Sequence, residues 1–254
     1  MPSNKPYPKV SIVTVVYNSR DALKATIENI TSQTYPNIEH IVIDGGSTDG
    51  SVEVANEYKD RIAYYVSEKD KGLYDAMNKG LRAATGEFVW FINTGDYIED
   101  NSVLMHLYEH WGLMDDVYYG ETHFIDQAGK LLGTRSQLTT RKVPEQLTWK
   151  SFKHGQVVSH QSIIVKRELA GEFDLKYKVS ADVDWGITAL KKATRIINTN
   201  MILTKYLVGG FSKQHQKTSW KERFDIFVKH YGWFEAVLFH AYFVLRAIWF
   251  RIKN

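Results

Sequence analysis

Three aspartates follow apolar runs that predict β-strands, and this spacing could bring them to one ligand-binding edge. They are Asp44 after residues 39–43, Asp70 after 61–67 and Asp96 after 88–92. In open α/β sheets, ligands bind outside the carboxyl ends of the strands. Three carboxylates at one edge repel each other unless a cation or hydrogen-bond donors are present. The set therefore favours a polar or metal-containing site, although Asp44 taken alone is explained equally well as a turn residue.

Asp96 is the aspartate with the clearest chemical context. Residues 88–92 are five aromatic or β-branched side chains in a row, which is typical of a central strand covered on both faces. Asn93, Thr94 and Gly95 break this pattern and place Asp96 just beyond the end of the strand. We predict that Asp96 holds a divalent metal and, through it, a diphosphate.

A second pair of carboxylates lies in the sequence Ser180-Ala-Asp-Val-Asp-Trp185. Asp182 and Asp184 could simply stabilise the start of a helix, where free amides and the helix dipole favour acidic side chains. Alternatively, Asp182 could act as a general base, since a hydroxyl is a poor nucleophile until a carboxylate accepts its proton. We favour the base for Asp182 and a supporting role for Asp184.

The elements that must position these residues alternate between strand and helix patterns in the first hundred residues. Strands are expected at 10–16, 39–43, 61–67 and 88–92, with helices from 21 and over 73–85. This rhythm predicts an α/β fold with a doubly wound, mostly parallel sheet and helices on both faces. After Asp96 we expect a helix at 102–113, a hairpin of 117–126 with 129–135, strands at 161–166 and 195–206, a helix from near Trp185 and a flexible joint at 209–212.

The composition excludes several classes of protein. The 254 residues carry a net charge of only +3 with acidic and basic residues interspersed, so nucleic acid is not an expected partner. No cysteine is present, which excludes disulfides and thiolate metal sites. The polar N-terminus does not resemble a signal peptide, and no run of 18 uncharged apolar residues predicts a transmembrane helix. We expect a cytoplasmic protein.

The last 35 residues form an aromatic and basic segment with helical spacing. Apolar side chains recur at steps of three and four residues from Phe224 to Trp249, with lysines and arginines between them. Such a segment could pack on the catalytic core. It could also lie in the plane of an anionic membrane, which we favour because charged residues interrupt the apolar run.

Four ordered motifs resemble one known family. The stretches 8–18, 44–51, 67–80 and 86–96 are similar to motifs of the family 2 glycosyltransferases with a GT-A fold. The subgroup that they resemble most comprises bacterial enzymes of surface-polysaccharide assembly, such as colanic-acid-type transferases. The resemblance covers residues 8–215 and implies a nucleotide-sugar-binding half (8–98), an acceptor-binding half (99–215) of the same GT-A domain and a helical tail (216–254).

The resemblance also implies roles for residues on the donor side. Val15 and Tyr17 would line the nucleobase pocket, and Asp44 would contact the base or ribose. Along the nucleotide and sugar would lie Asp70, Lys71 and Asn78. Asp75 could be a further ligand contact or only a favourable charge in the first helical turn.

The metal motif of the family departs here from its common form. Many relatives read Asp-x-Asp-Asp, whereas this chain has Asn93, Thr94, Gly95 and Asp96. Asp96 would then be the single carboxylate ligand of Mg²⁺ or Mn²⁺, which magnesium tolerates because it keeps several waters. Asn93 would contact substrate.

On the acceptor side, Asp182 aligns with the family's catalytic base. His160 and Gln161 resemble a His-Gln pair of the subgroup and are expected in the substrate site. His215 follows the predicted joint and could reach the metal or diphosphate after loop closure, or belong to a solvated linker.

These features predict an inverting, metal-dependent glycosyltransferase that moves a sugar from a nucleotide diphosphate sugar to a glycan or lipid-linked glycan acceptor, peripheral on the inner face of the bacterial membrane. A catalytically degenerate, membrane-associated scaffold on the same fold is the alternative, because of Asn93 and Gly95. A nucleotidyltransferase is disfavoured, since residues 10–20 lack the glycines of a phosphate loop.

Overall fold

A single nine-stranded sheet organises the computed structural model, which describes residues 6–209 and 215–253 except for the side chains of 244 and 246–253. The strands are β1 (Val10–Val16), β2 (Ile38–Asp44), β3 (Tyr64–Ser67), β4 (Phe88–Phe91), β5 (Tyr97–Ile98), β6 (Val117–Ile125), β7 (Leu131–Thr134), β8 (Ile163–Lys166) and β9 (Ile196–Leu207). Their order is β3-β2-β1-β4-β8-β6-β9-β5, with β7 paired to β6.

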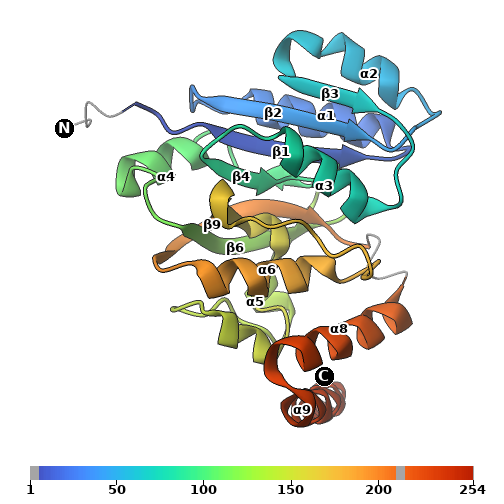
Figure 1. Cartoon of the computed structure of the whole chain (residues 1–254), viewed down its shortest axis with the longest axis vertical. Coiled ribbons are helices and arrows are strands. Elements are labelled where there is room, and N and C mark those ends of the chain that lie inside the picture. The colour runs from blue at the N-terminus through green and yellow to red at the C-terminus, as the bar shows by residue number, and fades with distance from the viewer. Residues whose placement is uncertain (1–5, 210–214, 254) are drawn as a thin grey trace.

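The helices cover both faces of this sheet (Figure 1). They are α1 (Arg20–Thr31), α2 (Ser51–Glu57), α3 (Leu73–Ala83), α4 (Val103–Trp111), α5 (Arg135–Leu138), α6 (Ala181–Lys192), α8 (Gln216–Tyr231) and α9 (Trp233–Lys253). Helices α3 and α6 pack on one face, and α1, α2 and α4 pack on the other. The predicted α/β architecture is therefore confirmed, including the C-terminal helical segment.

Strand β4 is buried on both faces, as its composition predicts. Val89 and Phe91 pack into the core shared with α3 and α6, whereas Phe88 and Trp90 pack into the core shared with α4. Successive side chains of a strand point to opposite faces, so an unbroken apolar run needs cover on both sides. Packing on both faces holds β4 in place, and thereby positions the Asn93–Asp96 turn that follows it.

Strand pairing differs between the two halves of the sheet. β3, β2, β1 and β4 pair in parallel, as predicted. From β8 onward antiparallel pairs enter, between β4 and β8, β8 and β6, and β9 and β5. The predicted hairpin is also present, since β6 and β7 pair antiparallel. Parallel strands need a crossover connection, whereas antiparallel strands can be joined by short turns.

The C-terminal helices pack against α6 rather than extending away from the domain. Ile226 and Phe227 of α8 are buried in the same core as α6, and Phe227 contacts Phe239 and Phe243 of α9 edge to face. Figure 1 shows α8 and α9 below α6, at the end of the molecule farthest from β3. In the part of the chain that the structure describes, no helix has the length and apolar character needed to cross a membrane.

Candidate functional site

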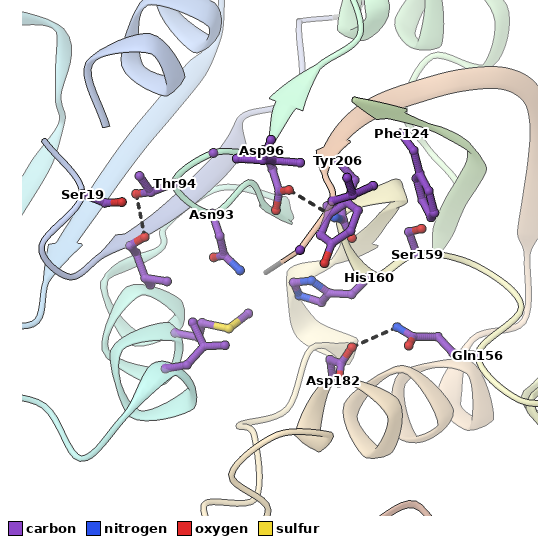
Figure 2. A pocket seen from close by; sticks show the side chains of 18 of the residues that line it. Ser19, Asn93, Thr94, Asp96, Phe124, Gln156, Ser159, His160, Asp182 and Tyr206 are labelled. Carbon is purple, nitrogen blue, oxygen red and sulfur yellow. Dashed lines mark hydrogen bonds between the residues drawn. The ribbon is translucent and has the colours of Figure 1, made fainter. Parts of the chain in front are cut away.

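A cavity of about 560 Å³ opens where β1 and β4 end, between the two halves of the sheet. In Figure 2, Asp96 and Asp182 lie on opposite sides of this cavity, with Asn93 and His160 between them in this view. Of the predicted site residues, it is lined by Val15, Tyr17, Asn93, Asp96, His160, Gln161 and Asp182.

Asp96 is a buried carboxylate with little support from the protein. Its side chain is 8% exposed, and Oδ1 accepts a hydrogen bond of 3.3 Å from the Gln161 side-chain amide. Burial raises the pKa of Asp96 to about 7, only partly offset by the Gln161 bond. A carboxylate that is costly to charge in the protein alone would be stabilised by a nearby cation.

Two further polar atoms at the cavity have no hydrogen-bond partner among the described residues. They are the buried Oδ1 of Asn93 and Nε2 of His160. Buried polar atoms are nearly always paired in native proteins, so such atoms call for a ligand or water. The described residues contain no cluster of three or more metal-ligating side chains. A cation here would therefore rest on Asp96, with amide oxygen from Asn93 as a possible partner. This oxygen-rich set fits Mg²⁺ or Mn²⁺.

Asp44 and Asp70, at the end of β2 and just after β3, lie near Tyr17, which lines the cavity. A Cβ atom on Gly45 would lie 2.4 Å from Asp70 Oδ2 and 3.4 Å from Tyr17 Cδ2, so both side chains pack against this glycine. Asp44 is buried, and its Oδ2 accepts from the Gly46 and Ser47 amides and the Ser67 hydroxyl. Its other oxygen, Oδ1, is buried without a partner among the described residues.

Lys71, Asp75 and Asn78, like Asp44 and Asp70, lie outside the lining of the cavity. Asp75 accepts from the backbone N–H of Lys71 at 2.9 Å, which closes the turn before α3. Both ends of the buried Asn78 amide bond the backbone of Phe173, at 2.9 and 2.7 Å. Asn78 therefore ties α3 to the segment before α6, and a ligand would have to compete with these bonds.

Asp182 faces Asp96 from the first turn of α6. This helix begins at Ala181, four residues before the predicted start near Trp185, so Asp182 is helical and not part of an approach loop. Its Oδ1 lies 3.0 Å from the Tyr74 hydroxyl, and its Oδ2 accepts a 2.9 Å bond from the Gln156 side-chain amide. Figure 2 shows Gln156 and Asp182 joined in this way. The carboxylate is thus held in place from two sides.

Asp184 occupies a different environment from Asp182. It is 5% exposed, and its two oxygens contact His230 Nε2 at 2.7 Å and Lys229 Nζ at 2.9 Å, both on α8. Burial alone would raise its pKa, but these bonds outweigh burial and hold the pKa of Asp184 below its usual range. Asp184 does not line the cavity, so the structure gives it a role in joining α6 to α8.

Glu222 of α8 fixes the segment that leads into α6. Its carboxylate accepts from the backbone N–H groups of Lys178, Val179 and Ser180, at 2.6, 2.9 and 2.9 Å. Glu222 is 7% exposed. Because the bonded amides immediately precede Asp182, a residue of the tail contributes to the position of the candidate base.

His160 and Gln161 lie in a short 3₁₀ turn before β8. The Gln161 carbonyl accepts from the Trp90 indole N–H at 2.7 Å, while its side chain reaches Asp96. The His160 ring packs against Phe91 and Trp185. Burial lowers the pKa of His160, opposed by the Asp182 charge, which favours a neutral imidazole.

His215 is an exposed turn residue at the start of α8 and does not line the cavity. Gly209 does line it, at the end of the described chain before α8. The predicted flexible joint falls on residues 209–212, of which 210–212 lie outside the described residues.

Several cavity residues were missed by the sequence reasoning. They are Ser19, Tyr74, Arg135, Gln156, Ser159, Tyr206 and Arg223. Arg135 is buried and donates to the backbone carbonyls of Val157 and Gln156, and burial lowers its pKa to about 10. A helical tail rich in Arg and Lys was recognised, but nothing in its spacing distinguishes Arg223, which enters the cavity, from its solvated neighbours.

Comparison with known proteins places this geometry in a family. Residues 11–172 match Glycosyl transferase family 2. An uncharacterized glycosyltransferase of Mycobacterium tuberculosis is 32% identical over 187 residues, covering 72% of this chain and 69% of that protein. The UDP-Glc:alpha-D-GlcNAc-diphosphoundecaprenol beta-1,3-glucosyltransferase WfaP of Escherichia coli is 27% identical over 210 residues, covering 82% of this chain and 80% of that one.

Solved structures share the fold. The mannosyltransferase PcManGT of Pyrobaculum calidifontis, in complex with GDP-Man and Mn²⁺, aligns with a TM-score of 0.66 and 18% identity over 90% of this chain and 66% of that one. S. aureus TarS 1-349 in complex with UDP-GlcNAc aligns with a TM-score of 0.63 and 18% identity over 87% of this chain and 66% of that one. The chain is therefore a member of the family 2 glycosyltransferases, built on the GT-A fold.

Proposed function

We propose that the protein is an inverting glycosyltransferase that moves a sugar from a nucleotide diphosphate sugar to a hydroxyl group of a glycan. The observation that carries this proposal is the placement of Asp182. A carboxylate held by Tyr74 and Gln156 faces a second carboxylate, Asp96, across one cavity. One side of the cavity would then bind the leaving diphosphate, and the other would activate the acceptor.

On the donor side, Asp96 would hold Mg²⁺ or Mn²⁺. The raised pKa of Asp96 and the unpartnered Asn93 oxygen support this, as does the presence of Mn²⁺ in the complex of PcManGT. When bound, such a cation supplies Lewis-acid stabilisation of the departing diphosphate. Val15 and Tyr17 would contact the nucleobase, and Asp44 and Asp70 behind them would contact the base or ribose.

On the acceptor side, Asp182 would accept the proton of the attacking hydroxyl group. The acceptor oxygen forms a bond to the anomeric carbon while the bond from that carbon to the diphosphate oxygen breaks on the opposite face. A single displacement of this kind inverts the anomeric centre. The hydrogen bonds from Tyr74 and Gln156 would orient Asp182 for this transfer, since a general base must lie within hydrogen-bond reach of the proton.

The acceptor that we propose is a lipid-linked glycan of surface-polysaccharide or glycolipid synthesis. WfaP, by its name, uses an acceptor sugar on diphosphoundecaprenol. A lipid-linked acceptor requires the enzyme to work at a membrane surface. Helix α9 offers an apolar face for such contact, with exposed side chains of Trp233, Phe234, Val237, Leu238, Tyr242 and Leu245. Interfacial helices bury such a face at the headgroup boundary.

The test is a screen of nucleotide sugars by thermal shift with Mn²⁺, since a bound donor raises the melting temperature by mass action. The donor that binds is then supplied with membranes or lipid-linked sugars, and the anomeric configuration of the product is determined by NMR. Binding of one donor class, followed by transfer with inversion, is expected. Retention of configuration would overturn the mechanism. Absence of both transfer and donor hydrolysis would favour a catalytically inactive binding protein.

A further inference from the structure

A second cavity adjoins the proposed active site and shares two residues with it. It has a volume of about 380 Å³. It lies between helices α6, α8 and α9 and the loop that follows α5. The side chains shared by the two cavities are Gln156 and Arg223. The volume falls in the range of small-molecule sites. The two cavities therefore meet at these shared side chains.

Most of the lining of this cavity is apolar, and charge is concentrated at Arg141 and Arg223. The apolar part consists of Leu138, Val183, Trp220, Phe227 and Phe243. Trp220 is 49% exposed and Leu138 is 45% exposed, so the cavity is open to the outside at these residues. An apolar ligand would bury surface here, while an anionic group would be favoured near the arginines.

Arg223 lies where the two cavities meet. Its Nη2 donates to Gln156 Oε1 at 3.3 Å, and Gln156 Nε2 donates to Asp182 Oδ2 at 2.9 Å. Arg223 Nε is buried, and no described residue accepts a hydrogen bond from it. A guanidinium with an unused buried N–H is suited to a phosphate oxygen. The chain of contacts thus leads from the apolar cavity through a cation to the proposed base.

We propose that the second cavity binds the first part of the isoprenoid chain of a lipid-diphosphate-linked acceptor, and that Arg223 binds its diphosphate. This inference rests on the proposed function. In such a molecule, the isoprenoid chain is followed by the diphosphate and then by the sugar hydroxyl groups. The protein presents the matching groups in the same order: the apolar lining, Arg223 and Asp182. The chain would enter beside Trp220, and the acceptor sugar would lie in the first cavity.

Helix α9 connects this cavity to the proposed membrane surface. His240 and Phe243 line the cavity, while Leu238, Tyr242 and Leu245 on the same helix are exposed. Side chains of one helix that are one or two positions apart point in different directions, so α9 separates the cavity from the outer apolar face. A chain that leaves the cavity would therefore meet apolar surface on the helix rather than water alone.

The test measures binding of farnesyl diphosphate to the full chain by calorimetry, with Mn²⁺ and a saturating concentration of the nucleoside diphosphate that the protein binds. The nucleotide blocks the donor site, so the probe cannot bind there as a diphosphate. Trp220→Asp places a charge at the entrance and should weaken binding about tenfold or more. Trp233→Asp is the matched control, because Trp233 is 65% exposed on the tail but does not line the cavity.

Two partial probes separate the chain from the phosphate. Arg223→Met should weaken farnesyl diphosphate about tenfold and leave farnesol unchanged, because only the former carries the anionic group. Trp220→Asp should also weaken farnesol, which carries no charge that the new carboxylate could repel. Equal effects of Trp220→Asp and Trp233→Asp, or no effect of Arg223→Met on farnesyl diphosphate, would overturn the proposal.

Failure of this inference can be told from failure of the proposed function. Nucleotide binding is measured in the same titrations before the probe is added, and Trp220→Asp should leave it unchanged. A protein that binds and turns over a nucleotide sugar, yet does not bind farnesyl diphosphate, would refute the isoprenoid site alone. A protein that binds no nucleotide would refute the proposed function, whatever the outcome with the isoprenoid probe.

Discussion

Asp96 and Asp182 face the same cavity but are supported by their surroundings in opposite ways. Asp96 is buried with one long hydrogen bond, and its pKa is raised to about 7. Asp182 is held by the Tyr74 hydroxyl and the Gln156 amide. The difference indicates that Asp96 needs a charged partner from outside the protein, whereas the protein itself already orients Asp182. It matches the roles proposed for a cation ligand and a general base.

The positions of these two carboxylates are fixed by different kinds of contact. Asp96 lies in the short turn after a central strand, β4, which pairs in parallel with β1 and antiparallel with β8. Asp182 depends on residues far away along the chain, including Tyr74 on α3, Gln156 in a loop and Glu222 on α8. Distant substitutions should therefore affect Asp182 more than Asp96, although the Asp96 carboxylate also accepts a bond from a distant residue, Gln161.

The largest expected effect comes from Asp182→Asn. An amide cannot accept the acceptor proton, so transfer should fall about 10²- to 10⁴-fold. Donor binding, measured by thermal shift with Mn²⁺, should persist because Asp182 lies on the acceptor side. Asp60→Asn changes an exposed carboxylate in the 3₁₀ turn Lys59–Arg61 and serves as the control. If Asp182→Asn lost donor binding and transfer to the same extent, Asp182 would not act on the acceptor alone, and the separate roles proposed for Asp96 and Asp182 would be wrong.

Asp96→Asn should change the pH dependence of stability in metal-free protein. The folded-state pKa of Asp96, about 7, lies above the unfolded value of 3.8, so the folded protein binds more protons between these values. Its contribution to the free energy of unfolding is present below about pH 4 and is lost as pH rises towards 7, by at most about 4 kcal/mol. Urea unfolding from pH 4 to 8 with EDTA should show a shallower decline in Asp96→Asn than in the wild type. Superimposable pH profiles would contradict the raised pKa.

Glu222→Gln tests the long-range support of Asp182. It removes charge-assisted bonds to three backbone amides, and we expect a loss of about 1.5–3 kcal/mol in the free energy of unfolding. The matched control is Glu172→Gln, which breaks an exposed ion pair with Arg82 and should cost less than about 1 kcal/mol. Urea titration measures both. If the two variants lose the same stability, α8 does not hold the segment before Asp182 as the structure indicates.

Tyr74→Phe is expected to have the smallest effect. It removes the hydroxyl that lies 3.0 Å from both Asp182 Oδ1 and the Val179 carbonyl, and should cost about 1 kcal/mol and slow transfer about fivefold. Steady-state kinetics should place the change in kcat rather than in KM for the donor. Tyr58→Phe, which loses only an exposed bond to Glu28, is the control. Unchanged kcat in Tyr74→Phe would assign the orientation of Asp182 to Gln156 alone.

The sequence by itself determined the parallel strands of the first hundred residues and the aspartates that follow them. Apolar runs followed by Asp44 and Asp96 predicted parallel strands and an acidic edge, and both predictions rest on residues that are adjacent in the chain. The strand β4 and the turn after it were predicted correctly because one short segment contains the strand, its end and the carboxylate. The expected role of Asn78 came from the resemblance and stays a prediction; no local pattern could tell that its amide bonds the backbone of Phe173.

Only the tertiary structure decided which side chains of the second half of the chain face the cavity. Asp182 and Asp184 are two residues apart, yet one faces the cavity and the other pairs with Lys229 and His230. Likewise, Arg223 belongs to a segment whose composition suggested either packing on the core or a membrane surface, and it reaches the cavity because α8 packs on α6. Such contacts join residues distant in the chain, so no local periodicity encodes them. They exist only once the elements have packed.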